Sequence, residues 1–333
     1  MVEGNPFQIL PCEIFLIIYS FVPPNITISH RCVSKFFNNL LKSIPIKTLD
    51  ADSKNLSSVP NEILDLKSLN KLYLFNNKLT SLPREIGQLL NLKQLCLDNN
   101  KLELLPGEIG QLSSLDGLKL DSNLLISLPE EIGNLFSLTR LMLDFNSLTS
   151  LPSEIGNLSS LEMLWLNNNR LWSLPAEIGN LLSLQKIWLK NNELISLPEE
   201  IGQLSSLKEL WLGRNQLTSL PAEIGYMESL IQIDLEYNML TSLPPEIGQL
   251  SSLQDLGLNN NRLTSLPPEI GQLSKLRTLW LHDNWLTSLP AEIVGLSSLI
   301  KITLFDNHNR ITVPPQYICD EGIDSIREYF NNL

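Results

Sequence analysis

The chain has 333 residues, of which 43% are apolar and 18% charged, and this composition is typical of a folded globular protein. Acidic residues outnumber basic ones by 36 to 24, and the basic residues form no stripe, which argues against nucleic acid as a partner. The longest early apolar run, residues 14–19, is too short to span a membrane and follows no basic residue, so we expect no membrane contact and no secretion signal.

Cysteine and histidine usage argues against an enzyme and against a secreted protein. The four cysteines, at 12, 32, 96 and 319, lack the spacing of a disulfide framework, which favours a reducing compartment and predicts a cytoplasmic protein. The three histidines, at 30, 282 and 308, have no nucleophile or metal-binding pattern around them. We therefore expect no catalytic residue, no metal, no cofactor and no small-molecule substrate.

Residues 1–45 form an element of their own, in which two apolar stretches are separated by a Pro-Pro break at 23–24. The first stretch opens with Leu-Pro-x-Glu, and the second ends in Val-Ser-Lys followed by a phenylalanine. This pattern resembles an F-box, a small all-α segment, and the matching residues are Leu10, Pro11, Glu13, Ile14, Ile18, Phe21, Val33, Ser34, Lys35, Phe37 and Leu40.

The resemblance implies that this segment binds a Skp-type adaptor in a cullin ubiquitin ligase. The residues it assigns to adaptor binding are Leu10, Pro11, Glu13, Ile14, Ile18, Val33, Lys35 and Phe37. The alternative is a pair of capping helices that shields the apolar end of the first repeat, since such a cap needs similar aliphatic residues.

Residues 46–310 repeat with a strict period of 23, marked by eleven prolines from Pro60 to Pro290. In one interval, 161–183, seven large aliphatic residues occupy the recurring apolar positions. Their burial contributes roughly 2 kcal/mol each, while ordering each residue of backbone costs about 1 to 2 kcal/mol. A single repeat therefore cannot fold alone, and the repeats must stack into a solenoid. The pattern resembles an intracellular leucine-rich repeat, which implies an α/β horseshoe of about twelve repeats with a parallel sheet on its concave side.

Two further columns of the repeat belong to its framework. Asparagine recurs at steps of 23 from Asn77 to Asn307, and a buried amide in stacked turns can satisfy free backbone groups. Glutamate follows each proline by two residues, where it suits the first turn of a short helix on the convex side. These 11 glutamates account for most of the net charge of −12, and without them it would be −1. The acidity is therefore interpreted as framework, and an acidic docking stripe is the alternative.

One residue per strand varies most, and it should project from the concave face because strand side chains alternate. This column reads Asp50, Tyr73, Cys96, Lys119, Met142, Trp165, Trp188, Trp211, Asp234, Gly257, Trp280 and Thr303. The three central tryptophans should form a continuous aromatic ridge, because neighbouring strands lie about 4.8 Å apart. Gly213, in a flanking column, should leave a gap beside Trp211. An exposed cluster of this composition predicts a binding surface. The predicted partner-binding residues are Arg140, Met142, Trp165, Lys186, Trp188, Trp211, Arg214, Asp234, Tyr237 and Trp280, with Asp144, Phe145 and Glu236 beside them.

Trp172 and Trp285 occupy other columns beside the turn, and we expect them to pack along the edge of the repeats. Residues 311–333 form the last element, whose apolar positions Ile318, Ile323, Ile326, Tyr329 and Phe330 predict a helix covering the open end of the core.

Two functions follow from these elements. The first is a substrate receptor of a ubiquitin ligase, in which the F-box-like segment binds the adaptor and the repeats recruit an unknown protein substrate. If the source is bacterial, such a protein would be an effector acting in the cytoplasm of a eukaryotic host. The second is a leucine-rich repeat scaffold without a ubiquitin role that binds a signalling protein, such as a small GTPase or a phosphatase.

Overall fold

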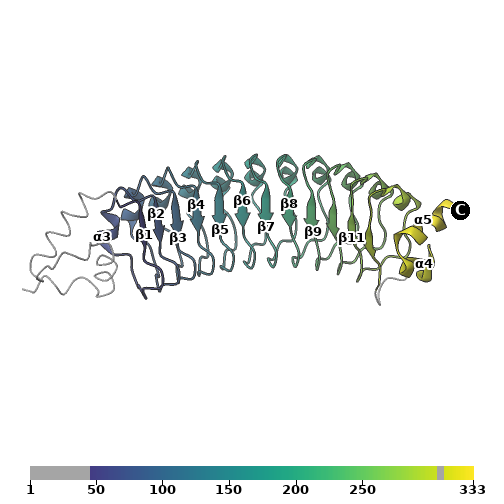
Figure 1. Cartoon of the computed structure of the whole chain (residues 1–333), viewed down its shortest axis with the longest axis horizontal. Coiled ribbons are helices and arrows are strands. Elements are labelled where there is room, and N and C mark those ends of the chain that lie inside the picture. The colour runs from purple at the N-terminus through teal and green to yellow at the C-terminus, as the bar shows by residue number, and fades with distance from the viewer. Residues whose placement is uncertain (1–45, 306–310) are drawn as a thin grey trace, which may run out of the picture.

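The computed structural model describes residues 46–305 and 311–333, and the repeats in it coil into a curved solenoid (Figure 1). One sheet of 12 parallel strands runs along the solenoid, and each strand pairs with its neighbours in the sequence. The strands are β1 (Thr48–Asp50), β2 (Lys71–Tyr73), β3 (Gln94–Cys96), β4 (Gly117–Lys119), β5 (Arg140–Met142), β6 (Met163–Trp165), β7 (Lys186–Trp188), β8 (Glu209–Trp211), β9 (Gln232–Asp234), β10 (Asp255–Gly257), β11 (Thr278–Trp280) and β12 (Lys301–Thr303).

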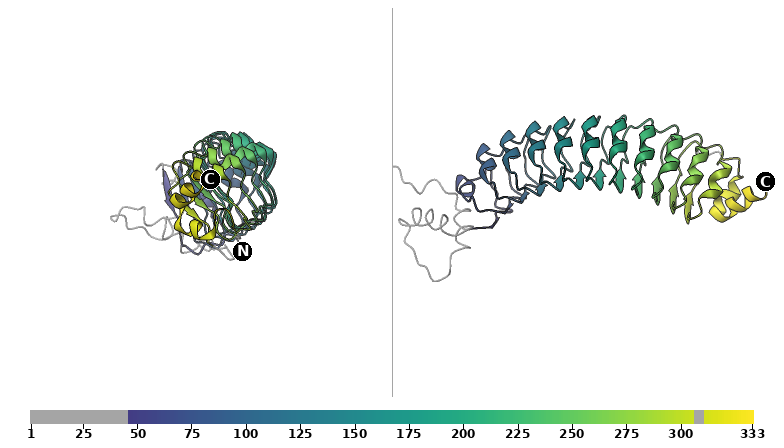
Figure 2. Two further views of the ribbon diagram at one scale, coloured as in Figure 1. Left: turned by 90° about the vertical axis from the view of Figure 1, so that its right-hand side faces the viewer. Right: turned by 90° about the horizontal axis from the view of Figure 1, so that it is seen from above.

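Short helices connect the strands on the opposite side of each coil. Figure 2 shows the strands on the inner side of the curve and the helices on its outer side, which confirms the predicted α/β solenoid with a concave sheet. The helices are α3 (Asn61–Leu64), η1 (Arg84–Gln88), η2 (Gly107–Gln111), η3 (Glu130–Asn134), η4 (Ser153–Asn157), η5 (Ala176–Asn180), η6 (Glu199–Gln203), η7 (Ala222–Tyr226), η8 (Pro245–Gln249), η9 (Pro268–Gln272), η10 (Ala291–Gly295), α4 (Gln316–Glu321) and α5 (Ile323–Asn331).

Most of the convex-side helices are single 3-10 turns, and η4 shows why they form. Pro152 caps the turn with φ of −68°, Glu154 lies in its first turn, and Ile155 is buried. Gly156 faces the next coil so closely that a Cβ would lie 2.4 Å from the backbone oxygen of Glu177. Proline therefore starts the turn, isoleucine anchors it, and glycine allows neighbouring turns to pack.

A continuous aliphatic core fills the solenoid between the sheet and the helices. In the repeat at 161–183, the seven aliphatic residues at the recurring apolar positions are each at most 6% exposed: Leu161, Leu164, Leu166, Leu171, Leu174, Ile178 and Leu181. They join one cluster of buried residues that runs from Leu49 to Ile326. Stacking thus provides the burial that an isolated repeat lacks.

The asparagine column is a buried hydrogen-bond framework, as predicted. The amide of Asn169 donates to the carbonyl oxygens of Leu143 at 2.9 Å and Leu166 at 3.1 Å, and its oxygen accepts from the backbone N–H of Leu148 at 3.1 Å. The same pattern recurs in the other described repeats, for example at Asn192. Each asparagine thereby links the turns of consecutive coils.

Two helices follow the last coil where the sequence predicted one. Gly322, with φ of +100°, separates α4 from α5, and Cys319, Ile323 and Ile326 are buried against the core. Arg327 of α5 donates to the carbonyl oxygen of Leu296 at 2.5 Å. Gly322 interrupts the helix, so the buried residues that cover the end of the core come from two helices, Cys319 from α4 and Ile323 and Ile326 from α5.

Residues 1–45 and 306–310 lie outside the described part of the chain. The F-box-like segment and the domain boundary predicted at residue 45 therefore stay predictions. The same holds for the adaptor-binding residues Leu10, Pro11, Glu13, Ile14, Ile18, Val33, Lys35 and Phe37, and for Asn307.

Candidate functional site

The concave face presents three columns of side chains from each coil. In the coil of β7 they are Lys186 and Trp188 of the strand and Lys190 just after it, while Ile187 and Leu189 between them are fully buried. The alternation follows from the pleat of the strand. The three columns therefore form the concave surface, and the residues between them belong to the core.

Trp165, Trp188 and Trp211 end the paired strands β6, β7 and β8 in the same register. Their ring centroids lie 5.5 Å apart for the first pair and 6.2 Å apart for the second, in edge contacts with planes at 82° and 64°. All three side chains are partly exposed. The predicted ridge is present as a contiguous row, which we call the tryptophan row. Each contact adds about 0.5–1.5 kcal/mol beyond area burial, so the row also stiffens this part of the sheet.

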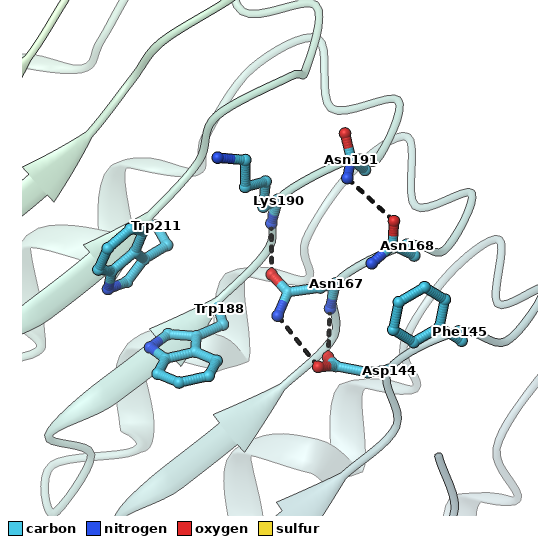
Figure 3. Close-up of a pocket in the computed structure, with 8 residues that line it drawn as sticks. All are labelled: Asp144, Phe145, Asn167, Asn168, Trp188, Lys190, Asn191 and Trp211. Atoms are coloured by element: carbon cyan, nitrogen blue, oxygen red, sulfur yellow. Dashed lines mark hydrogen bonds between the residues drawn. The ribbon is translucent and has the colours of Figure 1, made fainter. Parts of the chain in front are cut away.

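The indole nitrogen of Trp188 lies within the row, on the side facing Trp211 (Figure 3). It is buried and has no hydrogen-bond acceptor among the described residues. An N–H directed at an aromatic face makes only a weak hydrogen bond. The row thus presents indole faces and edges, and its central N–H is screened from solvent.

Met142 continues the row toward the N-terminus, because β5 pairs it with Trp165. A cavity of about 220 Å³ lies on the N-terminal side of the row and is lined by Tyr73, Cys96, Lys119, Arg140 and Met142, among others. The apolar surface of the concave face therefore extends over four consecutive strands.

Two of the predicted basic site residues form ion pairs with neighbouring coils. Arg140 lies 2.9 Å from Asp116, and Lys186 lies 2.6 Å from Glu209. Because these pairs are partly exposed, each contributes little to stability, about 0–1 kcal/mol. They nevertheless hold the side chains close to the sheet on one side of the row.

The gap predicted at Gly213 is filled, which corrects the sequence-based expectation. The ammonium of Lys190 reaches past Gly213 to the carboxylates of Glu236 and Asp234, the latter at 3.7 Å. A Cβ on residue 213 would lie 2.9 Å from the Cγ of Glu236. Glycine therefore leaves room for an ion pair across two coils, beside Trp211.

Trp280 does not join the row. It ends β11, and the same column holds Asp234 in β9 and Gly257 in β10, so two strands without an aromatic ring separate it from Trp211. A separate stacked pair, His282 and Phe305, lies in the C-terminal coils with ring centroids 4.9 Å apart. The structure thus brings together the central site residues and leaves Trp280 outside them.

The turn after each strand from β2 to β11 holds one residue in the left-handed region, with φ between +52° and +58°. Six of these ten residues are asparagine or aspartate, which tolerate this conformation. Phe145, Arg214 and Tyr237 are large exceptions, and the left-handed conformation costs each of them about 1–2 kcal/mol. Phe145 is 58% exposed and Tyr237 44%, with the Arg214 guanidinium 4.3 Å from the Tyr237 ring centroid. Backbone strain at exposed residues beside the tryptophan row is typical of a functional surface.

An aspartate column leads to the row from the N-terminal side, and sequence analysis missed it. Asp98 accepts a hydrogen bond from the backbone N–H of Asp121 at 3.2 Å, and Asp121 accepts one from that of Asp144 at 2.8 Å. Burial, followed by the charge of Asp98, raises the pKa of Asp121 to about 7. Burial likewise raises the pKa of Asp52 to about 6. The spacing of 23 residues between these aspartates was the available signal.

Replacing Asp121 with asparagine should stabilise the protein at neutral pH. Asn167, two coils along the same column, shows that an amide fits, since it donates to Asp144 at 3.1 Å and accepts from the Lys190 N–H at 2.9 Å. We expect Asp121→Asn to raise the free energy of unfolding at pH 8 by about 1 kcal/mol, because it removes two cross-strand like-charge pairs. Urea denaturation followed by circular dichroism would measure this.

The pH dependence supplies a second check. The folded pKa of Asp121, about 7, exceeds its unfolded value of 3.8. The folded state therefore binds more protons between these values, and the wild type should lose stability as pH rises from about 4 to about 7. Asp121→Asn should flatten this decline, whereas Asp65→Asn, at an exposed position, should not. A lower stability of Asp121→Asn at pH 8 would contradict the interpretation.

A cavity of about 320 Å³ lies beside the tryptophan row, and we call it the Trp188 pocket. Its lining residues are Asp144, Phe145, Asn167, Asn168, Trp188, Lys190, Asn191 and Trp211. In Figure 3, Asp144 lies between Trp188 and Phe145, and the Asn167 side chain lies above it with hydrogen bonds to Asp144 and Lys190. The pocket thus combines aromatic walls with a carboxylate and amides.

The remaining candidates lie away from this site. Burial raises the pKa of the Cys96 thiol to about 11, which makes it a poor nucleophile. Within residues 46–305 and 311–333 no group of acidic, histidine or cysteine side chains could hold a metal ion, and no described helix could cross a membrane. Trp172 and Trp285 are 57% and 51% exposed and lie outside the concave columns.

Comparison with protein families finds leucine-rich repeats along most of the array. A family model described as leucine-rich repeat region matches residues 118–210 and 176–260. Two models described as leucine rich repeat match residues 251–308, and residues 68–89 and 91–112. These are repeat families, and none is a catalytic family. A comparison with curated protein sequences found no match.

Solved structures with the same fold come from several organisms. A leucine-rich repeat protein of Leptospira interrogans is 41% identical, with a TM-score of 0.70, and the match covers 80% of this chain and 74% of that one. Toll, in its complex with Spatzle from Drosophila, is 30% identical with a TM-score of 0.68, and the match covers 75% of this chain but only 35% of Toll. The internalin InlF of Listeria monocytogenes is 20% identical with a TM-score of 0.65 over 92% of this chain and 95% of its own, a likeness of fold alone.

The identity to the Leptospira protein extends over most of both chains, and the period, the buried asparagines and the parallel sheet agree with it. A solenoid of this kind suits protein binding. This chain belongs to the leucine-rich repeat family.

Proposed function

We propose that this protein is a receptor that holds a protein partner on the concave face of its repeats, with the tryptophan row at the centre of the contact. The observation that carries the proposal is the row itself, three partly exposed indoles in edge contact. Tryptophan is the residue most enriched at the energetic centres of protein interfaces, and exposed aromatic clusters seldom persist without a partner.

The surroundings of the row support a polypeptide partner. Phe145, Arg214 and Tyr237 flank it as large exposed side chains at a left-handed turn position that most other coils give to asparagine or aspartate. Toll, which is 30% identical to this chain, is known in complex with Spatzle, and this supports a polypeptide ligand for a solenoid of the same kind.

We further propose that residues 1–45 are an F-box and that the protein is the substrate receptor of a Skp/cullin ubiquitin ligase. The support is the sequence resemblance at residues 10–40. In this arrangement the segment binds the adaptor and the concave face binds the substrate, while the catalytic residues belong to the ligase. The receptor acts by raising the local concentration of its substrate near the ubiquitin carrier.

The similarity to a Leptospira protein supports a bacterial source. An F-box in a bacterial protein finds its adaptor only in a eukaryotic host. We therefore propose an effector that acts in the host cytoplasm, a reducing compartment that suits cysteines without the spacing of a disulfide framework.

Calorimetry with a purified Skp-type adaptor tests the F-box. We expect the full-length protein to bind the adaptor and the double variant Leu10→Ala, Pro11→Ala to lose at least about tenfold in affinity, since truncated interface anchors typically cost 1 kcal/mol or more each. A Trp188→Ala variant should bind the adaptor as the wild type does. Absence of binding by a folded wild type would reduce residues 1–45 to a cap and favour a repeat scaffold without a ubiquitin role.

A further inference from the structure

The Trp188 pocket has a chemistry of its own within the concave face. The aromatic rings of Trp188, Trp211 and Phe145 line it, and the carboxylate of Asp144 lies between Trp188 and Phe145 (Figure 3). Its volume of about 320 Å³ is at the low end for ligand pockets, which suits a single side chain.

The Asp144 carboxylate retains capacity for another donor. One oxygen accepts from the backbone N–H of Asn167 at 2.6 Å, and the other accepts from the side-chain amide of Asn167 at 3.1 Å. Each carboxylate oxygen can accept two hydrogen bonds, so both have a second site. Burial raises the pKa of Asp144, which is the cost that a cation bound beside it would relieve.

Charge on this side of the row is acidic. Asp98 and Asp121 continue the column of Asp144 toward the N-terminus, one coil apart, through the hydrogen bonds described above. Lys190, the basic residue that lines the pocket, directs its ammonium to Glu236 and Asp234 and is neutralised there. The net electrostatic character at the Asp144 end of the pocket therefore favours a positive group.

The same face already holds a guanidinium on an aromatic ring. The guanidinium carbon of Arg214 lies 4.3 Å from the ring centroid of Tyr237. Both residues occupy the left-handed turn position, Arg214 two coils and Tyr237 three coils beyond Asn168. Guanidinium groups bind tryptophan faces more favourably than tyrosine faces. They also form paired hydrogen bonds with carboxylates, which ammonium groups cannot match.

We infer that the Trp188 pocket binds an arginine side chain of the protein partner, with the guanidinium hydrogen-bonded to Asp144 between the aromatic rings of Trp188 and Phe145. This inference rests on the proposed binding function of the concave face and adds the chemistry of its anchor residue. It also accounts for the phenylalanine at this left-handed turn position, because asparagine, the usual residue there, would leave the pocket without an aromatic wall on that side.

Acetyl-arginine amide is the probe, and acetyl-citrulline amide, its neutral isostere, is the control. The measurement is the shift of the tryptophan indole N–H signals of the full-length protein in NMR spectra at physiological salt, where distant charges are screened. We expect saturable shifts of the Trp188 and Trp211 signals with the arginine compound and none with the citrulline compound. Asp144→Asn and Phe145→Asn should each weaken binding at least about fivefold, as expected for loss of a charge-assisted or cation–π contact.

The chain offers matched control variants. Asp65→Asn removes an exposed carboxylate and Trp172→Ala removes an exposed aromatic ring outside the concave columns, and neither residue lines the pocket. Both controls should bind the arginine compound within about twofold of wild type. Equal shifts with citrulline, or no saturable shift with either compound in a folded protein, would overturn the inference. The affinity of the Trp188→Ala, Trp211→Ala double variant for the protein partner would still decide separately whether the tryptophan row binds that partner.

Discussion

Replacing a central asparagine, Asn169→Ala, should destabilise the protein by about 3 to 5 kcal/mol. The side chain is 8% exposed and supplies both an acceptor for the Leu148 N–H and donors for the carbonyls of Leu143 and Leu166. Its removal leaves these groups without partners in a buried turn, and each unsatisfied group costs about 1–3 kcal/mol.

Urea denaturation followed by circular dichroism would measure this loss, and Arg170→Ala, at the exposed position next to Asn169, is the matched control. The control should change the free energy of unfolding by less than about 0.5 kcal/mol. Because stability in a repeat array depends on contacts between neighbours, Asn169→Ala should also weaken cooperativity between the two halves and broaden the transition. A loss below about 1 kcal/mol would mean that water replaces the amide.

The double variant Trp188→Ala, Trp211→Ala should lower affinity for the protein partner at least about 100-fold. Central tryptophans of an interface typically contribute 2 kcal/mol or more each when truncated, and a factor of ten in affinity corresponds to about 1.4 kcal/mol. The two rings also line the Trp188 pocket, so both the aromatic surface and the pocket are lost together.

The partner would be obtained by capture on the wild-type protein and its affinity measured by biolayer interferometry. Trp172→Ala and Trp285→Ala remove an exposed indole outside the concave columns and should leave affinity within about twofold of wild type. Thermal melting of each variant separates lost contacts from lost folding, since the edge contacts within the row contribute to stability. Unchanged affinity in a folded double variant would refute the proposed centre of the interface.

The repeated features of the fold were predictable because every coil has the same neighbours. Residues 23 apart occupy equivalent positions, so one interval predicts the strand, the buried leucines and the asparagine for the whole array. The alternation of strand side chains placed Trp165, Trp188 and Trp211 on one surface for the same reason. The helix type and the break at Gly322 were not predicted, because short apolar patterns do not distinguish one helical form from another or specify where a helix ends.

The sequence by itself determined the period, and with it the solenoid, the core and the row of tryptophans, since these depend only on which residues recur at each step. Tertiary structure alone decided the contacts between side chains of different coils, the backbone torsions of the turns and the pKa values of buried groups. Lys190 crosses Gly213 to reach Glu236, Phe145 stands in a left-handed turn, and burial together with the Asp98 carboxylate raises the pKa of Asp121. The physical reason is that these properties depend on side-chain reach, backbone torsion and desolvation across coils, which residue spacing along the chain does not contain.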